Sequence, residues 1–222
     1  MTDNRFQYTQ ADRDAIYRVI NERRDMRHFC GGHVKKDTLW KLLEAAHHGP
    51  SVGYMQPWRF IHITDINKRQ AIHGLVEQER LLTRDALGDR GNEFMKLKLE
   101  GILECAELLV VALADKREQH IVGRRTLPEM DLASAACAIE NMWLAARAEG
   151  LGMGWVSLFS PDDLKQLLRM PDGSHPVAIL CLGPVEQFYE RPMLEIAGWV
   201  NRENLQELVF ENNWEQSALI NE

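Results

Sequence analysis

The apolar positions of this chain follow a helical period in some segments and form short continuous runs in others. Ile16, Val19 and Ile20 stand at helical spacing and predict a helix over residues 10–23. A second helix is predicted over residues 37–47, and four of its apolar residues are expected to face inward: Leu39, Trp40, Leu42 and Leu43.

Strands are expected in four places. The continuous apolar run at residues 108–114 is typical of a strand that is buried on both faces, and residues 177–183 have the same character. Shorter strands are expected at residues 59–64 and 154–159. The alternation of these strands with long helices is typical of an α/β protein.

A long helix is predicted from Asp131, as its cap, to Glu149, with Gly150 as its C-terminal stop. Small residues fill its first half and allow another backbone to approach closely, so the helix is either central or faces another subunit: Ala133, Ser134, Ala135, Ala136, Cys137 and Ala138. A later helix is expected to start with Ser160 as its cap and Pro161 in its first position.

Two segments of the chain have less regular patterns. A helix is expected to start near Ile66, but residues 81–98 are charged and weakly apolar, and they fit either a mobile lid or a plain solvent-facing helix. The apolar and aromatic stretch from Leu208 to Trp214 has little chain after it. The apolar side chains of this stretch are expected to pack against another surface, and a partner subunit is one candidate.

The composition is that of an ordinary globular protein. The chain has 222 residues, 45% hydrophobic and 27% charged, which is enough for a single domain over residues 1–222. A net charge of −7 does not favour binding to nucleic acid or to an anionic membrane surface. We expect neither a signal peptide nor a membrane span, since no apolar run suits one. Four scattered cysteines favour free thiols in a reducing cytoplasm.

A first motif of candidate binding residues lies at positions 23–29, which read Arg-Arg-Asp-Met-Arg-His-Phe. Arg23, Arg24 and Arg27 carry planar groups of donors that suit a phosphate. The alternative is a solvated helix end, because cations are favoured near a helix C-terminus.

A second motif lies at residues 50–58, between a helix and a strand, and reads Pro-Ser-Val-Gly-Tyr-Met-Gln-Pro-Trp. Ser51 and Gln56 offer hydrogen bonds, and Tyr54 and Trp58 offer stacking faces, so the loop suits a flat heteroaromatic ligand. The alternative is a surface turn in which Trp58 anchors the strand.

The sequence motifs of several other binding and catalytic sites are absent. The glycines at residues 150–154 lie between a helix and a strand, the reverse of the order that a dinucleotide fingerprint requires. No P-loop and no Gly-x-Ser-x-Gly elbow is present. The histidines and cysteine at residues 28–33, and His47 with His48, lack structural-zinc spacing, so no metal site is predicted.

Together, the two motifs resemble those of the nitroreductase-like flavoproteins, which show Arg-Arg-Ser-x-Arg-x-Phe and then Pro-Ser-x-x-Asn-x-Gln-Pro-Trp. Asp25 replaces the usual serine and Tyr54 the usual asparagine. Both departures fit one branch, the BluB family of dimethylbenzimidazole synthases. The resemblance extends to Trp214 through further segments: 150–157, 176–183, Arg191 with Pro192, Gly198 with Trp199, and 208–214.

The resemblance implies a nitroreductase-like fold, with a central, mostly antiparallel or mixed sheet surrounded by helices. It also implies a homodimer in which a C-terminal arm, residues 198–222, is exchanged and the flavin site spans the subunit interface. The residues expected to bind FMN are Arg23, Arg24, Asp25, Met26, Arg27, Pro50, Ser51, Gly53, Tyr54, Gln56, Gly154, Trp155, Ser157 and Arg202. Among them, Arg23 and Arg27 are expected at the phosphate or ribityl chain. Arg202, near the C-terminus, is expected to contact the same phosphate.

The resemblance implies an enzyme that consumes reduced FMN with molecular oxygen. The products of this branch are 5,6-dimethylbenzimidazole, the lower ligand of cobalamin, and D-erythrose 4-phosphate. Asp25, kept ionised by a neighbouring arginine, and Ser157 are the expected catalytic residues. Tyr54 is expected to narrow the pocket over the ring.

Two other functions stay open at this point. One is a conventional FMN-dependent NAD(P)H oxidoreductase that acts on nitro compounds, quinones or flavins, and the other is a flavin carrier without chemistry. Asp25 and Tyr54 favour the flavin-cleaving enzyme. The sequence leaves open whether NAD(P)H binds directly or a separate flavin reductase supplies the electrons.

Overall fold

The computed structural model describes residues 5–214 and 216, and the chain divides after Glu190 into two compact units. The first unit contains the sheet and the long helices. The second unit, from Arg191, contains the short helix α7 (Met193–Ile196) and the 3-10 turn η4 (Leu205–Leu208). None of the described helices is both long and apolar enough to cross a membrane.

The helices of the first unit are α1 (Gln10–Glu22), α2 (Lys36–His47), α3 (Ile66–Ala86), α4 (Gly91–Phe94), α5 (Met130–Ala148) and α6 (Pro161–Leu167). Its strands are β1 (Trp58–His62), β2 (Glu107–Leu113), β3 (Gly152–Val156) and β4 (His175–Gly183). Short 3-10 turns are η1 (Val52–Tyr54), η2 (Gly88–Arg90) and η3 (Arg117–Gln119). The expected order of helices and strands is confirmed, although β3 starts earlier and ends earlier than its pattern predicted.

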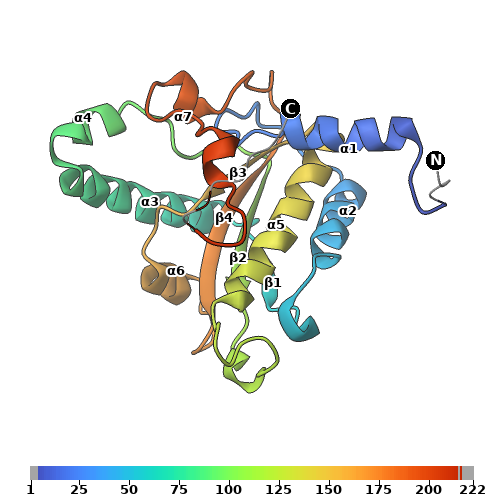
Figure 1. Cartoon of the computed structure of the whole chain (residues 1–222). Helices are drawn as coiled ribbons and strands as arrows, with labels where there is room; N and C mark the ends of the chain where they lie inside the picture. The colour runs from blue at the N-terminus through green and yellow to red at the C-terminus, as the bar shows by residue number, and fades with distance from the viewer. Residues whose placement is uncertain (1–4, 215, 217–222) are drawn as a thin grey trace. The chain divides into compact units, whose positions relative to one another are not determined.

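The four strands form one sheet in the order β1-β2-β4-β3, and each neighbouring pair is antiparallel. Figure 1 shows α2 and α5 over one face of this sheet and α3 and α6 over the other. Leu109 and Val111 of β2 pack toward α2 and α5, whereas Leu108 and Val110 pack toward α3 and α6. The apolar run therefore forms a strand that is buried on both faces, as predicted.

The ends of two helices follow their local sequence. Ser160 caps α6, because its Oγ accepts a hydrogen bond from Asp163 N at 3.3 Å. Gly150 has a φ of +74°, a left-handed conformation that suits glycine after a helix end.

Asp131 does not cap α5, contrary to the prediction, because the helix starts at Met130 with Glu129 at the cap position. The Asp131 carboxylate is buried and lies between two guanidinium groups instead, 2.7 Å from Arg117 and 2.9 Å from Arg124. A buried carboxylate gains more from two charged donors than from one backbone N–H, which explains the difference.

Two helices, α1 and α2, have exposed apolar side chains. Trp40 of α2 is 64% exposed, so its prediction as an inward residue is wrong. On α1, Ile16 and Ile20 of the apolar stripe are also exposed, and no residue of the helix is buried. These helices therefore have apolar surface that the described part of the chain does not cover.

The segment at residues 81–98 combines the end of α3 with the turns that follow it. Phe94 and Leu97 are buried, which fixes this segment against the core. Arg80 of α3 donates hydrogen bonds to the carbonyl oxygens of Met95, at 2.7 Å, and Leu97, at 3.3 Å. The segment is thus not a plain solvent-facing helix, and a lid role stays a prediction.

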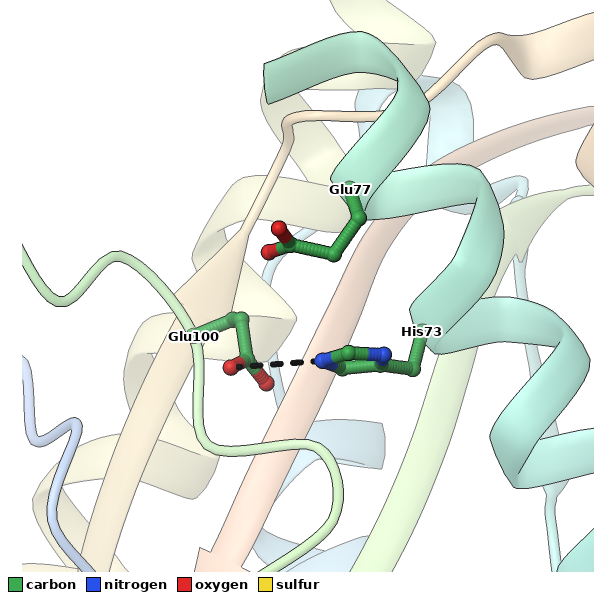
Figure 2. A group of neighbouring side chains, drawn as sticks. All are labelled: His73, Glu77 and Glu100. Carbon is green, nitrogen blue, oxygen red and sulfur yellow. Dashed lines mark ion pairs between the residues drawn. The ribbon is translucent and has the colours of Figure 1, made fainter. Parts of the chain in front are cut away.

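A cluster of ionisable side chains lies beside this segment. Figure 2 shows His73 and Glu77 on α3 and Glu100 on the chain after α4, with their ligand atoms within 4.8 Å of one another. His73 Nε2 lies 3.8 Å from Glu100, and Arg80 lies 3.3 Å from Glu77. Since Arg80 already compensates one of the carboxylates, we interpret the cluster as charge contacts that fasten the segment to α3.

We expect Arg80→Ala to loosen residues 95–98, because two backbone carbonyls lose their donors. Amide hydrogen exchange in this segment should become roughly tenfold faster, while exchange in β2 stays unchanged. Arg84→Ala, which removes a partly exposed arginine of the same helix, serves as the matched control. Equal exchange in both variants would contradict the anchoring role of Arg80.

Candidate functional site

The first motif runs in an extended conformation beside β3. Met26 N donates a hydrogen bond to Met153 O at 2.9 Å, and Asp25 forms an isolated parallel bridge with Met153. The Met26 side chain is fully buried, so it anchors the segment and offers a ligand only its backbone. Because side chains alternate along extended chain, Asp25 and Arg27 point to the same side.

Asp25, Arg27 and Trp155 form a closed set of hydrogen bonds. Arg27 Nη2 lies 2.5 Å from Asp25 Oδ2 and 2.7 Å from the carbonyl oxygen of Trp155. The backbone N–H of Trp155 donates to Asp25 Oδ1 at 3.0 Å. The carboxylate and the guanidinium group are thereby fixed against the backbone of β3, a rigid element.

Arg27 is the best candidate for an anion ligand. Its side chain is only 9% exposed, yet its Nε and Nη1 are buried without a hydrogen-bond partner. Leaving such donors unsatisfied costs free energy, and a charged group raises this cost. Phosphate oxygens accept hydrogen bonds from such guanidinium donors, so the residues present fit a phosphorylated ligand.

The pKa of Asp25 is raised from its ordinary value of 3.8, mainly because burial disfavours the charged carboxylate. Arg27, the backbone N–H of Trp155 and Arg23 act in the opposite direction, but their effects are smaller. Arg27 thus favours the ionised carboxylate, as expected, but burial outweighs it in the net shift of the pKa. A raised pKa makes the carboxylate a stronger base, which suits proton transfer.

Gly154 is required by the close packing of the motif against β3. A Cβ atom at this position would lie 2.2 Å from Met26 O and 3.0 Å from Arg27 Nη1. Any other residue would push the first motif away from the strand. Gly154 thus positions Arg27 and Asp25.

The other two arginines of the motif have different surroundings. Arg23 lies 3.3 Å from Glu140 and its guanidinium stacks over Trp143 at 4.6 Å, but it stays partly exposed. Arg24 donates to the carbonyl oxygens of Asn21, at 2.6 Å, and Glu190, at 2.8 Å. Arg23 can therefore exchange its partner for a ligand, whereas Arg24 is largely used in holding the backbone.

The second motif folds into a tight turn that includes η1. Ser51 Oγ accepts a hydrogen bond from Gln56 N at 3.1 Å, and Ser134 Oγ accepts one from Val52 N at 3.0 Å. Gly53, Tyr54 and Gln56 all have positive φ angles. Tyr54 is 82% exposed, and its place over a flavin ring stays a prediction.

Trp58, in contrast, is buried at the start of β1. Its Nε1 donates to His47 Nδ1 at 3.2 Å, and the two rings meet edge to face. The alternative in which Trp58 anchors the strand is thus confirmed, and its ring is not a free stacking surface.

The two motifs lie at opposite ends of α5. The second motif contacts Ser134, near the start of the helix, whereas Arg24 O accepts a hydrogen bond from Trp143 Nε1 near its end. These two helix positions are roughly 13 Å apart at 1.5 Å per residue. Figure 1 shows the same separation, with α1 close to the end of α5 and the turn between α2 and β1 close to its start.

The remaining predicted residues fall into separate places. Ser157 follows β3 directly and is exposed, close in sequence to Trp155. Pro50 and Gly53 belong to the second motif. Arg202 belongs to the second unit, so its role at a phosphate stays a prediction.

Tyr189 is a residue that the sequence patterns did not single out. Its Oη accepts a hydrogen bond from Arg27 N at 3.2 Å and lies 2.6 Å from His28 Nδ1. A tyrosine in a loop after the last strand carries no signal of its own, because the contact spans most of the chain. Only the fold brings Tyr189 to the first motif.

The fold and the site define an α/β protein with a helix-covered antiparallel sheet. Beside strand β3 of this sheet lies a candidate anion-binding site, in which Arg27 has two side-chain donors without a hydrogen-bond partner. A sequence model of the nitroreductase family matches residues 20–184, and the chain belongs to this family.

Individual relatives agree with this assignment. The chain is 36% identical over 192 residues to a 5,6-dimethylbenzimidazole synthase of Rhodospirillum rubrum, covering 86% of this chain and 91% of the relative. A BluB-like flavoprotein from Clostridium difficile 630 has the same fold, with a TM-score of 0.68 and 19% identity over 89% of this chain and 99% of that one. An oxidized iodotyrosine deiodinase bound to FMN and 3-iodo-L-tyrosine superposes with a TM-score of 0.65 and 21% identity, covering 85% and 98%.

Proposed function

We propose that this protein is an oxygen-dependent enzyme that fragments reduced FMN into 5,6-dimethylbenzimidazole and D-erythrose 4-phosphate. The observation that carries the proposal is the pair of Asp25 and Arg27. Arg27 keeps two buried donors unpaired, and Asp25 stands beside it as an ionisable group where related flavoproteins have a serine. The identity to a 5,6-dimethylbenzimidazole synthase supports the same reaction.

Arg27 would hold the phosphate or the adjoining ribityl chain of FMN, with Arg23 as a second cation at the same edge. Arg27 is held against β3, and Arg23 lies at the start of the same segment, beside Glu140 of α5. Gly154 and Trp155 would act indirectly, because the missing side chain of Gly154 lets the first motif pack against β3 and the Trp155 backbone holds Asp25 and Arg27. Reduced FMN, as the substrate, would supply the electrons and the carbon atoms of both products, and the remaining atoms of its pyrimidine ring would leave as a third fragment.

Asp25 would accept and return protons at the ribityl chain. Its carboxylate is fixed by Arg27 and by the Trp155 N–H, and the direction of its pKa shift increases its basicity. Ser157 lies two residues beyond Trp155 and would relay or orient a proton from the edge of the site.

A homodimer would complete this site. Within one chain the second motif lies at the other end of α5 from Arg27, and Tyr54 is exposed. In a symmetric pair, the second motif of one copy can face the first motif of the other. Uncovered apolar side chains on α1 and α2, among them Ile16, Ile20 and Trp40, support such an association.

The exposure of Tyr54 favours a second candidate, a conventional FMN-dependent NAD(P)H oxidoreductase acting on nitro compounds, quinones or flavins. If Tyr54 stays turned outward in the assembled protein, a bulky second substrate can reach the flavin ring. In that case Asp25 would be part of the binding site without a role in flavin cleavage.

The deciding experiment is aerobic incubation of the purified protein with FMN and a separate flavin reductase, followed by mass analysis of small molecules. We expect loss of FMN with stoichiometric appearance of 5,6-dimethylbenzimidazole, and no product without oxygen. Replacing the separate reductase by NAD(P)H alone shows whether the protein uses the nicotinamide directly. Intact FMN with continued consumption of NAD(P)H would instead identify the conventional oxidoreductase.

A further inference from the structure

The chain after the last strand returns to the first motif, and Tyr189 makes the contact. Its Oη accepts a hydrogen bond from the backbone N–H of Arg27 at 3.2 Å. The same oxygen lies 2.6 Å from Nδ1 of His28, and the two rings meet edge to face with centroids 6.0 Å apart. Tyr189 therefore contacts two consecutive residues of the motif, one by its backbone and one by its side chain.

The hydroxyl group of Tyr189 can act as both acceptor and donor in these two contacts. A tyrosine hydroxyl donates one proton and accepts through its lone pairs. Because the N–H of Arg27 already donates to Oη, the hydroxyl can donate its proton to His28 Nδ1 in the neutral tautomer that carries its proton on Nε2. His28 thus orients the hydroxyl, and the hydroxyl in turn fixes the peptide from which the Arg27 side chain extends.

This peptide has few other ways to satisfy its N–H. Arg27 is buried, so water has little access, and a buried backbone donor without an acceptor is costly. Without the hydroxyl, the peptide would shift toward another acceptor. Asp25 and the carbonyl of Trp155 fix only the tip of the Arg27 side chain, so the shift would displace Nε and Nη1.

We infer that Tyr189 is a positioning residue for anion binding, acting through Arg27, and that His28 orients its hydroxyl. The inference rests on the proposed function, because it assigns the unpartnered donors of Arg27 to the FMN phosphate. Tyr189 lies outside the first and second motifs. The geometry gives it a role in ligand selectivity, toward flavins that carry a phosphate.

The test is the affinity of the full-length protein for FMN and for riboflavin, measured by quenching of flavin fluorescence. Tyr189→Phe keeps the ring against His28 and removes only the hydroxyl. We expect the Kd for FMN to rise roughly tenfold and the Kd for riboflavin to change less than about twofold. Tyr17→Phe, which removes a hydroxyl from an exposed residue of α1, should leave both constants unchanged.

A second variant keeps the inference testable if Tyr189→Phe lowers the stability. His28→Leu should raise the Kd for FMN about threefold alone and add nothing in the Tyr189→Phe background, because both act through one hydroxyl. An unchanged preference for FMN over riboflavin in both single variants would overturn the inference. A wild-type protein that binds the two flavins equally would instead contradict the phosphate assignment of Arg27, and with it the proposed function.

Discussion

Asp25→Asn is expected to abolish formation of 5,6-dimethylbenzimidazole while FMN still binds. The amide keeps an oxygen that can accept hydrogen bonds from Arg27 and the Trp155 N–H, but it cannot take up a proton. Loss of a general base lowers rates by roughly 100-fold or more. The measurement is product formation in single-turnover reactions, with flavin affinity determined on the same protein.

The Ser157→Ala variant provides a comparison for Asp25→Asn. Ser157 is exposed and follows β3, so the loss of its hydroxyl should lower turnover less than the loss of the carboxylate. Undiminished product from Asp25→Asn would contradict the assigned role of Asp25 as a base. Loss of flavin binding in that variant would show that the carboxylate acts mainly by holding Arg27.

The pH dependence of stability gives an independent test of the Asp25 environment. Because burial raises the pKa of Asp25 above 3.8, its contribution to stability is fully present below that pH and is lost as the pH rises through the folded-state pKa. Asparagine does not titrate. The melting temperature of the wild type, relative to Asp25→Asn, should therefore fall as the pH rises above 3.8. A relative increase would mean that Arg27 outweighs burial.

Arg27→Ala is expected to weaken FMN binding far more than riboflavin binding. The two flavins differ only in the phosphate, and Arg27 supplies two buried donors that have no other partner. Hydrogen bonds to charged groups contribute about 1.5–3 kcal/mol each, so the loss of two donors should raise the Kd for FMN by at least roughly 100-fold. Isothermal titration with both flavins measures the difference.

The matched control for Arg27→Ala is Arg84→Ala, which removes a partly exposed arginine that pairs with its neighbour Asp85 at 2.7 Å. This variant removes the same charge from the protein without touching the first motif, so both affinities should stay at the wild-type values. Equal losses of FMN and riboflavin in Arg27→Ala would place Arg27 away from the phosphate.

The sequence alone determined the order of helices and strands, because periodicity and end signals are local. The run at 108–114 predicts a strand buried on both faces, and Ser160 with Pro161 predicts a helix start, and the structure confirms both. The two motifs also pointed to the nitroreductase family, since the spacing of Arg23, Asp25 and Arg27 is specific.

Only the tertiary structure decided how the candidate site residues differ from one another. Three arginines look alike in the sequence, but burial beside β3 leaves donors unpaired on Arg27, while backbone carbonyls engage Arg24. The direction of the Asp25 pKa shift depends on burial, which competes with charges brought together from distant segments. Tyr189 reaches Arg27 across most of the chain, and no local pattern encodes such a contact, because hydrogen bonds between distant segments form only when the sheet and its helices are assembled.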